Sequence, residues 1–72
     1  PVNVGDLELF DAKSVVDPKA LAAAGFIRSE RTRVKILGGG DLTKSLVIRG
    51  IPVSKKAKEK IESAKGAVEA AP

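Results

Sequence analysis

The amino-acid sequence predicts a small single α/β domain of irregular strand-strand-helix turns, with two helices and short strands. Two observations carry this fold class. Each predicted helix begins at a capping residue and closes at a glycine, and two apolar, strand-like segments flank a run of three glycines. The chain has 72 residues, and a domain of this size removes only about 60% of its unfolded surface from water. We therefore expect residues 1–72 to form one domain with a thin, aliphatic core.

The first two elements are predicted from alternation and from capping chemistry. Residues 2–10 alternate apolar and polar positions around a glycine, which fits a short strand or a strand followed by a turn. Asp17 followed by Pro18 is a strong helix start, because the Asp side chain accepts from free backbone amides and proline loses no bond at the first helical position. The helix is expected over residues 18–24, with Gly25 as its left-handed end.

Extended structure is expected after this helix over residues 26–28, 34–37 and 44–50. The last two segments are predicted to be strands joined through residues 38–43, whose glycines allow the positive-φ positions that such a connection needs. Consecutive glycine amides can also cradle a phosphate. The phosphate-loop pattern is absent, however, because Lys44 follows Gly40 at the wrong spacing. The connection between strands is therefore the favoured interpretation.

A second helix is expected to begin after Ser54 and to close at Gly66. Its inner stripe is predicted to consist of Ala57, Ile61, Ala64 and Val68. Several lysines stand near its start, where the helix dipole favours acids instead, so something other than helix stability favours them. Pairs of Lys and Glu four residues apart support the alternative of an ion-paired, solvated face. Residues 70–72 are expected to be a frayed end.

The composition excludes several classes of function. The chain has no cysteine and no histidine, which removes disulfides, thiolate metal sites and imidazole bases. Its apolar stretches are far shorter than the roughly 18 residues that cross a bilayer, so no membrane partner is expected. The acidic residues near the N-terminus are irregularly spaced, and we predict no catalytic residues, no metal and no cofactor. Both phenylalanines are expected in the core rather than as platforms for stacking bases.

Charge is distributed unevenly along the chain. The formal net charge is +4, yet residues 1–17 are acidic, and two basic blocks follow over residues 18–35 and 42–65. This pattern indicates a surface that faces a polyanion. Alternate positions at Arg31 and Arg33 would share one strand face, which suits a sugar-phosphate ridge, with a solvated loop as the alternative. The predicted phosphate or sugar contacts are Arg28, Arg31, Arg33, Lys35, Lys44, Lys55, Lys56 and Lys58.

Three segments of the chain together resemble a known family. They are Asn3-Val4-Gly5-Asp6-Leu7, the run from Val34 through the glycines to Lys44, and the stretch from Ser54 to Gly66. In this order they resemble the C-terminal globular domain of the bacterial large-ribosomal-subunit protein fifteen family. The resemblance implies a mixed α/β domain packed among ribosomal RNA and neighbouring proteins. It also implies a basic N-terminal arm, absent from these residues, that carries most RNA contacts.

The resemblance also assigns structural duties to particular positions. Gly38 and Gly40 would shape the turn, while Lys65 departs from the family, which commonly has glycine there. The implied core residues are Val34, Ile36, Leu37, Leu42, Ile61 and Val68. The sequence is thus interpreted as a non-enzymatic constituent of the large ribosomal subunit, without homo-oligomers, in a cytoplasmic or organellar ribosome. It would bind large-subunit RNA and support assembly and translation. The alternatives are a protein-protein interaction module without RNA binding, and a nucleotide-binding enzyme suggested only by the glycine run.

Overall fold

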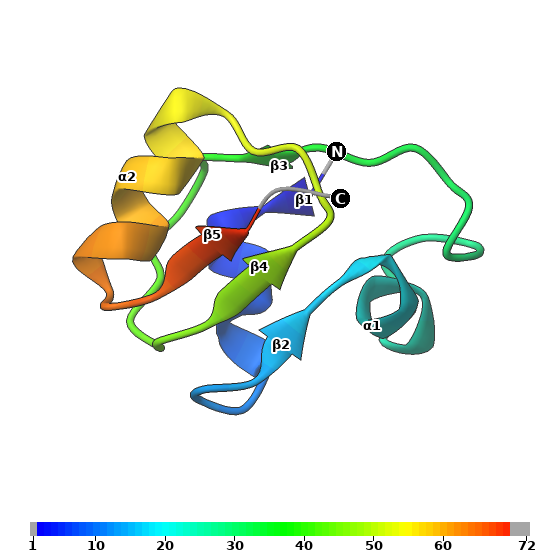
Figure 1. Ribbon diagram of the computed structural model, residues 1–72, viewed down its shortest axis with the longest axis horizontal. Coiled ribbons are helices and arrows are strands. Elements are labelled where there is room, and N and C mark those ends of the chain that lie inside the picture. Colours follow the sequence, from blue (N-terminus) through cyan, green and yellow to red (C-terminus); the bar gives the residue numbers. More distant parts are fainter. Residues whose placement is uncertain (1, 70–72) are drawn as a thin grey trace.

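The computed structural model describes residues 2–69 and confirms a small α/β domain with two α-helices and short strands (Figure 1). The elements in chain order are β1 (Val2–Asn3), the 3-10 helix η1 (Val4–Leu9), β2 (Val15–Val16), α1 (Pro18–Ala23), β3 (Ile36–Leu37), β4 (Val47–Arg49), α2 (Lys55–Ser63) and β5 (Ala67–Glu69). The expectation for residues 70–72 lies outside the described residues. Between residues 2 and 69, no helix has the length and apolar character that crossing a membrane requires.

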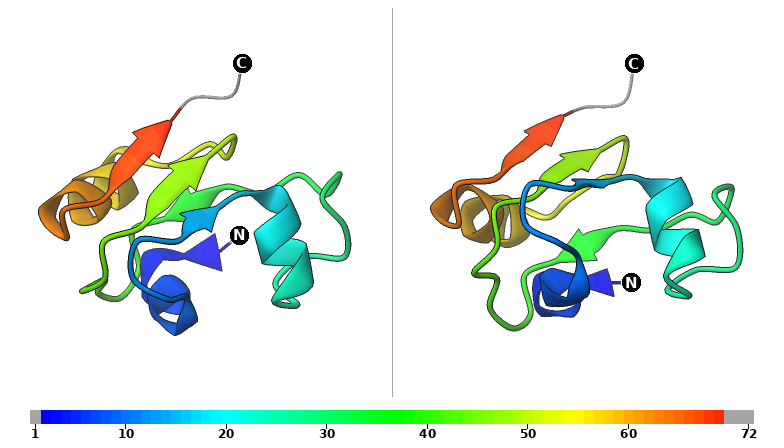
Figure 2. Two further views of the ribbon diagram at one scale, coloured as in Figure 1. Left: turned by 60° about the horizontal axis from the view of Figure 1, so that its bottom comes forward. Right: turned by 90° about the horizontal axis from the view of Figure 1, so that it is seen from below.

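The strands form two small sheets in which every pairing is parallel. β1 pairs with β3, and a second sheet has the order β2-β4-β5 with β4 in the middle. Figures 1 and 2 show α2 crossing between β4 and β5. The two strands predicted around the glycine run are present but shorter than expected. They pair with other strands and lie in separate sheets.

Both helix starts are confirmed by their capping hydrogen bonds. The Asp17 carboxylate accepts from the Ala20 amide at 2.8 Å, and the Ser54 hydroxyl accepts from the Ala57 amide at 3.1 Å. Each bond satisfies one of the backbone donors that a helix start leaves without an intrahelical partner. The end of α1 is also as predicted, because Gly25 has a φ of +86°.

The end of α2 differs from the prediction in one residue. Lys65, not Gly66, has the left-handed conformation, with a φ of +68°. The amides of Lys65 and Gly66 donate to the carbonyls of Glu62 and Ile61, both at 2.9 Å, which is the Schellman pattern. Gly66 is instead required by space, because a Cβ there would lie 2.3 Å from the Leu46 carbonyl oxygen.

The segment between α1 and β3 contains no strand, so two expectations were wrong. Residues 26–28 form bends, and the extended segment that should begin at residue 34 begins only at Ile36. Arg31, Arg33 and Lys35 therefore share no strand face. The physical reason is local competition: the Arg31 amide donates to the Ser29 hydroxyl at 3.2 Å, and the Ser29 amide donates to the Thr32 hydroxyl at 3.3 Å. Such bonds offer the backbone an alternative to a sheet ladder.

The core is aliphatic and is shared by both sheets and both α-helices. Its largest fully buried side chains are Leu7, Leu21, Ile36, Leu46, Ile48, Ile61, Val4 and Val16. Among the implied core residues, Ile36, Leu42 and Ile61 are buried, whereas Val34, Leu37 and Val68 are only half-buried. On α2, Ala57 and Ile61 are buried and Ala64 packs against them. The two phenylalanine rings are half-buried at the edge of this core, with centroids 6.2 Å apart.

Candidate nucleic-acid interface

The glycine run packs tightly against the start of the chain. The Gly39 amide donates to the Asn3 side-chain oxygen at 3.0 Å, and the Gly5 amide donates to the Gly39 carbonyl at 3.0 Å. A Cβ on Gly5 would lie 3.1 Å from the Gly40 Cα. The backbones of the two segments therefore touch, which is the close approach that glycine permits.

Lys60 holds the glycine run from the other side. Its Nζ atom donates to the carbonyl oxygens of Gly38 and Gly40, at 2.7 and 2.5 Å. Together with the bond from Gly39 to Asn3, these contacts use polar groups of the run inside the protein. The arrangement does not resemble an open cradle for phosphate, and it counts against the nucleotide-binding alternative.

Glu8 fixes the far end of the same connection, just before β4. Its carboxylate accepts from the Thr43 amide, from the Thr43 hydroxyl at 2.9 Å and from the Lys44 amide at 3.2 Å. These hydrogen bonds, above all the one from the Thr43 amide, hold the pKa of Glu8 below its ordinary value of 4.5. The carboxylate lies near Lys44, so that lysine is the one predicted contact that has an acidic neighbour in this network.

Replacing Glu8 by glutamine should give a pH-dependent loss of stability. Because the folded-state pKa is lowered, the carboxylate stabilises the fold above the unfolded-state pKa, and this contribution disappears as the pH falls through the folded-state pKa. Urea midpoints should therefore differ between the Glu8→Gln variant and the parent at pH 7, and the difference should shrink as the pH falls below about 4.5. Asp41→Asn, which removes a carboxylate from the same connection, is the control. A gap between Glu8→Gln and the parent that does not change with pH would contradict the assignment.

The three segments that carry the family resemblance meet at this place. Asn3 and Glu8 come from the first ten residues, the glycines from the central connection and Lys60 from α2. All three contribute hydrogen bonds to one network. Their duty is architectural, in agreement with the structural roles that the resemblance implies.

The predicted RNA-contacting residues fall into separate groups. Arg28, Arg31, Arg33 and Lys35 are exposed along residues 26–35, and Lys55, Lys56 and Lys58 are exposed at the start of α2. Lys44 is half-buried. Figure 1 places α2 at one end of the domain and the loop that follows α1 at the other. The structure therefore does not gather the predicted contacts into a single patch, although seven of the eight are fully exposed.

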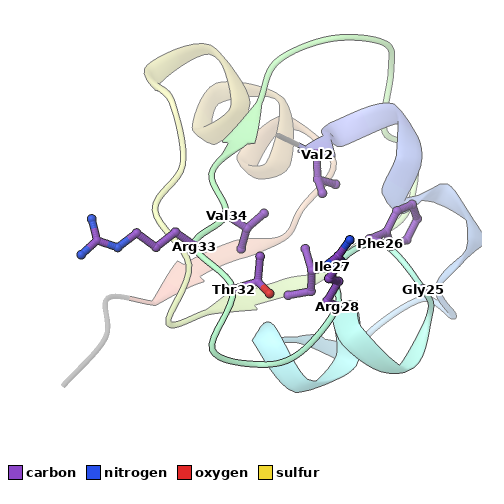
Figure 3. Close-up of a pocket in the computed structure, with 8 residues that line it drawn as sticks. All are labelled: Val2, Gly25, Phe26, Ile27, Arg28, Thr32, Arg33 and Val34. Carbon is purple, nitrogen blue, oxygen red and sulfur yellow. The ribbon is translucent and has the colours of Figure 1, made fainter.

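A cavity of about 470 Å³ lies against the loop of residues 26–35 (Figure 3). Its lining residues are Val2, Gly25, Phe26, Ile27, Arg28, Thr32, Arg33 and Val34. Figure 3 shows the Arg33 side chain extending away from the other lining residues. The lining has two cations and no carboxylate, so it offers contacts for an anion and no acid-base pair.

Sequence reasoning missed the roles of Lys60 and Glu8. Lys60 could have been found, because it lies three residues after Ala57 and therefore on the same side of α2 as the buried stripe. No local signal marks Glu8, since its partner Thr43 is distant in the sequence.

The chain matches known proteins over nearly its whole length. Residues 1–69 match the family described as ribosomal proteins 50S-L15 and 50S-L18e with their 60S counterpart. The large ribosomal subunit protein uL15 of Geobacter sulfurreducens is 50% identical over 68 residues, which are 94% of this chain and 46% of that protein. For uL15 of Desulfatibacillum aliphaticivorans the identity is 50% over 70 residues, 97% of this chain and 48% of that protein.

A third relative, uL15 of Geobacter metallireducens, is 47% identical over 68 residues, again 94% of this chain and 46% of that protein. The chain spans about half the length of the curated relatives it matches, and it aligns with their C-terminal part. Both the family match and the identities extend across both sheets and both α-helices. The chain therefore belongs to this family of ribosomal proteins.

Proposed function

We propose that this chain is a structural constituent of the large ribosomal subunit that binds large-subunit ribosomal RNA, and that it is not an enzyme. It supports subunit assembly and translation within a cytoplasmic or organellar ribosome. The observation that carries the proposal is the exposed loop of residues 26–35, which presents four cationic side chains in a chain of this family. An RNA backbone is the polyanion that such a loop would meet in a ribosome.

The mechanism rests on charge and position. Each cation that contacts a phosphate releases condensed counterions, which favours binding and makes it dependent on salt. Hydrogen bonds among Ser29, Arg31 and Thr32 give the loop a defined backbone path, so that less conformational freedom is lost on binding. The lysines of α2 lie at the other end of a domain 28 Å long. We propose that the two groups contact separate RNA segments and so hold the domain in position.

Reversing the charge of Arg31 and Arg33 together should weaken RNA binding. The Arg31→Glu, Arg33→Glu variant loses two phosphate contacts and gains repulsion, so affinity for protein-free bacterial large-subunit RNA should fall at least about tenfold at low salt. The slope of log affinity against log salt concentration should become shallower by about one to two. Filter binding across a salt series measures both quantities.

The matched control for this variant keeps the charge. The Arg31→Lys, Arg33→Lys variant should retain most of the parent affinity, and thermal unfolding should show that all three proteins are folded. Parent-like affinity and slope in the charge-reversed variant would overturn the assignment of this loop.

Neighbouring large-subunit proteins are further proposed partners. Leu9 is 60% exposed and Val15 is 39% exposed, which are large apolar side chains left open on the surface. The interaction-module alternative would hold if the parent bound a large-subunit protein at all salt concentrations and bound no RNA.

We further infer that residues 1–72 are one globular domain of a longer ribosomal protein. The support is that the relatives are about twice as long as the chain and align with it through their C-terminal part. An upstream arm rich in basic residues, as the resemblance implies, would add RNA contacts to those proposed here.

A further inference from the structure

The parallel order of the three-stranded sheet brings lysines together that are far apart in the sequence. β2, β4 and β5 run in the same direction, with Val15, Val47 and Ala67 in register across them. Their amino ends consequently lie along one edge of the sheet, which is visible in Figure 1. The turns that lead into them contain Lys13, Lys44 and Lys65.

Ser45 ties the two outer turns to the central one. The Lys13 amide donates to the Ser45 carbonyl at 2.5 Å, and the Ser45 hydroxyl donates to the Lys65 carbonyl at 2.9 Å. The backbones of Lys13 and Lys65 are therefore held on either side of Ser45. Neighbouring strands lie about 4.8 Å apart, so these two backbones are separated by about 10 Å.

Lys13 and Lys65 share an unusual backbone conformation. Both have a φ of +68°, and they are the non-glycine residues with positive φ within the described part of the chain. Glycine adopts this conformation without steric cost, so the backbone alone does not explain a long cationic side chain at either place. Residues held in such conformations point to a function that the strain serves.

Both side chains are available to a ligand. Lys13 and Lys65 are exposed, and the ion pair that residues 2–69 form joins Arg49 to Glu69 and involves neither lysine. Lys44 is half-buried, and Glu8 beside it offsets part of its charge. The outer two lysines therefore supply most of the positive charge along this edge.

We propose that Lys13, Lys44 and Lys65 form a basic row that binds the phosphate backbone of RNA. This inference rests on the proposed function, because the ligand is the same ribosomal RNA. It adds a contact surface on the edge of the sheet, separate from the loop of residues 26–35, and two residues that sequence reasoning did not select.

The test compares binding of the chain and its variants to protein-free bacterial large-subunit RNA across a salt series. The Lys13→Gln, Lys65→Gln variant should bind about tenfold more weakly at low salt, with a slope shallower by about one to two. The Lys13→Arg, Lys65→Arg variant keeps both charges and should bind like the parent.

A single substitution separates binding from backbone effects. Lys65→Gly relieves the positive φ and should raise the melting temperature, while the loss of one cation should weaken RNA binding. Opposite changes in the two quantities support the row. A higher melting temperature with unchanged RNA affinity would show that Lys65 has no part in binding and would overturn the proposal.

The outcomes also separate this inference from the proposed function. If the parent shows no salt-dependent RNA binding, the proposed function fails and the row fails with it. If the parent binds and the Arg31→Glu, Arg33→Glu variant is weakened, but Lys13→Gln, Lys65→Gln is not, only the row is overturned. That last result would also be found if the row served an acidic protein segment instead of RNA.

Discussion

Gly66→Ala should be the most destabilising single substitution of those considered, leaving little folded protein at room temperature. A Cβ at this position would lie 2.3 Å from the Leu46 carbonyl oxygen and 3.1 Å from the Ile61 carbonyl oxygen. These are backbone atoms, so no rotamer change relieves the clash. The Leu46 carbonyl also accepts from the Ala67 amide at 3.0 Å, where β5 begins. We expect a loss of about 3 kcal/mol or more, a large part of the stability of a small domain.

Urea unfolding followed by circular dichroism measures this loss, and Gly25→Ala is the matched control. Gly25 also ends a helix, but a Cβ there would meet nothing within 4 Å, and its φ of +86° is the remaining obstacle. The control should lose only about 1–2 kcal/mol. Equal losses in the two variants would show that conformation, rather than space, governs Gly66.

Lys60→Met should be the second most damaging change. It preserves most of the side-chain volume but removes the ammonium group that donates to Gly38 and Gly40 at 2.7 and 2.5 Å. Hydrogen bonds from a charged donor are worth about 1.5–3 kcal/mol, and partial exposure of the side chain reduces the sum, so we expect a loss of about 2–3 kcal/mol. Chemical denaturation gives the value directly.

Lys58→Met tests whether any lysine of α2 would give the same result. Lys58 is exposed on the same helix, and its substitution should change stability by no more than about 0.5 kcal/mol. The clamp role of Lys60 would be rejected if the two methionine variants unfolded at the same urea concentration.

The helices could be predicted from the sequence because their signals act over short distances. The side chains of Asp17 and Ser54 each bond to an amide three residues ahead, so residue type and spacing suffice. The exact residue at the end of α2 was beyond this reasoning. Glycine in the sequence suggests a left-handed position, but at Gly66 it meets a spatial need set by Leu46, which no local pattern reveals.

The sheets were less predictable because their strands are short and their partners distant. β2 has two residues, too few for an alternating pattern, and its partner β4 lies beyond α1 and β3. In residues 26–35 the basic composition correctly predicted exposure, while the hydrogen bonds of Ser29 and Thr32 prevented the expected strand. The RNA contacts stay a prediction, whereas Lys60 proved to be an internal clamp.

The exclusively parallel pairing of the strands has a kinetic consequence. Val2 pairs with Ile36, and Val15 pairs with Val47, so each contact closes a long loop before it contributes any stability. Folding rates fall as such distant pairings dominate, and α2 with nine residues is too short to persist alone. During synthesis, the sheet around β4 stays incomplete until β5 has been made. Folding of this domain is thus a late event in the emergence of the chain, with little stable structure before it.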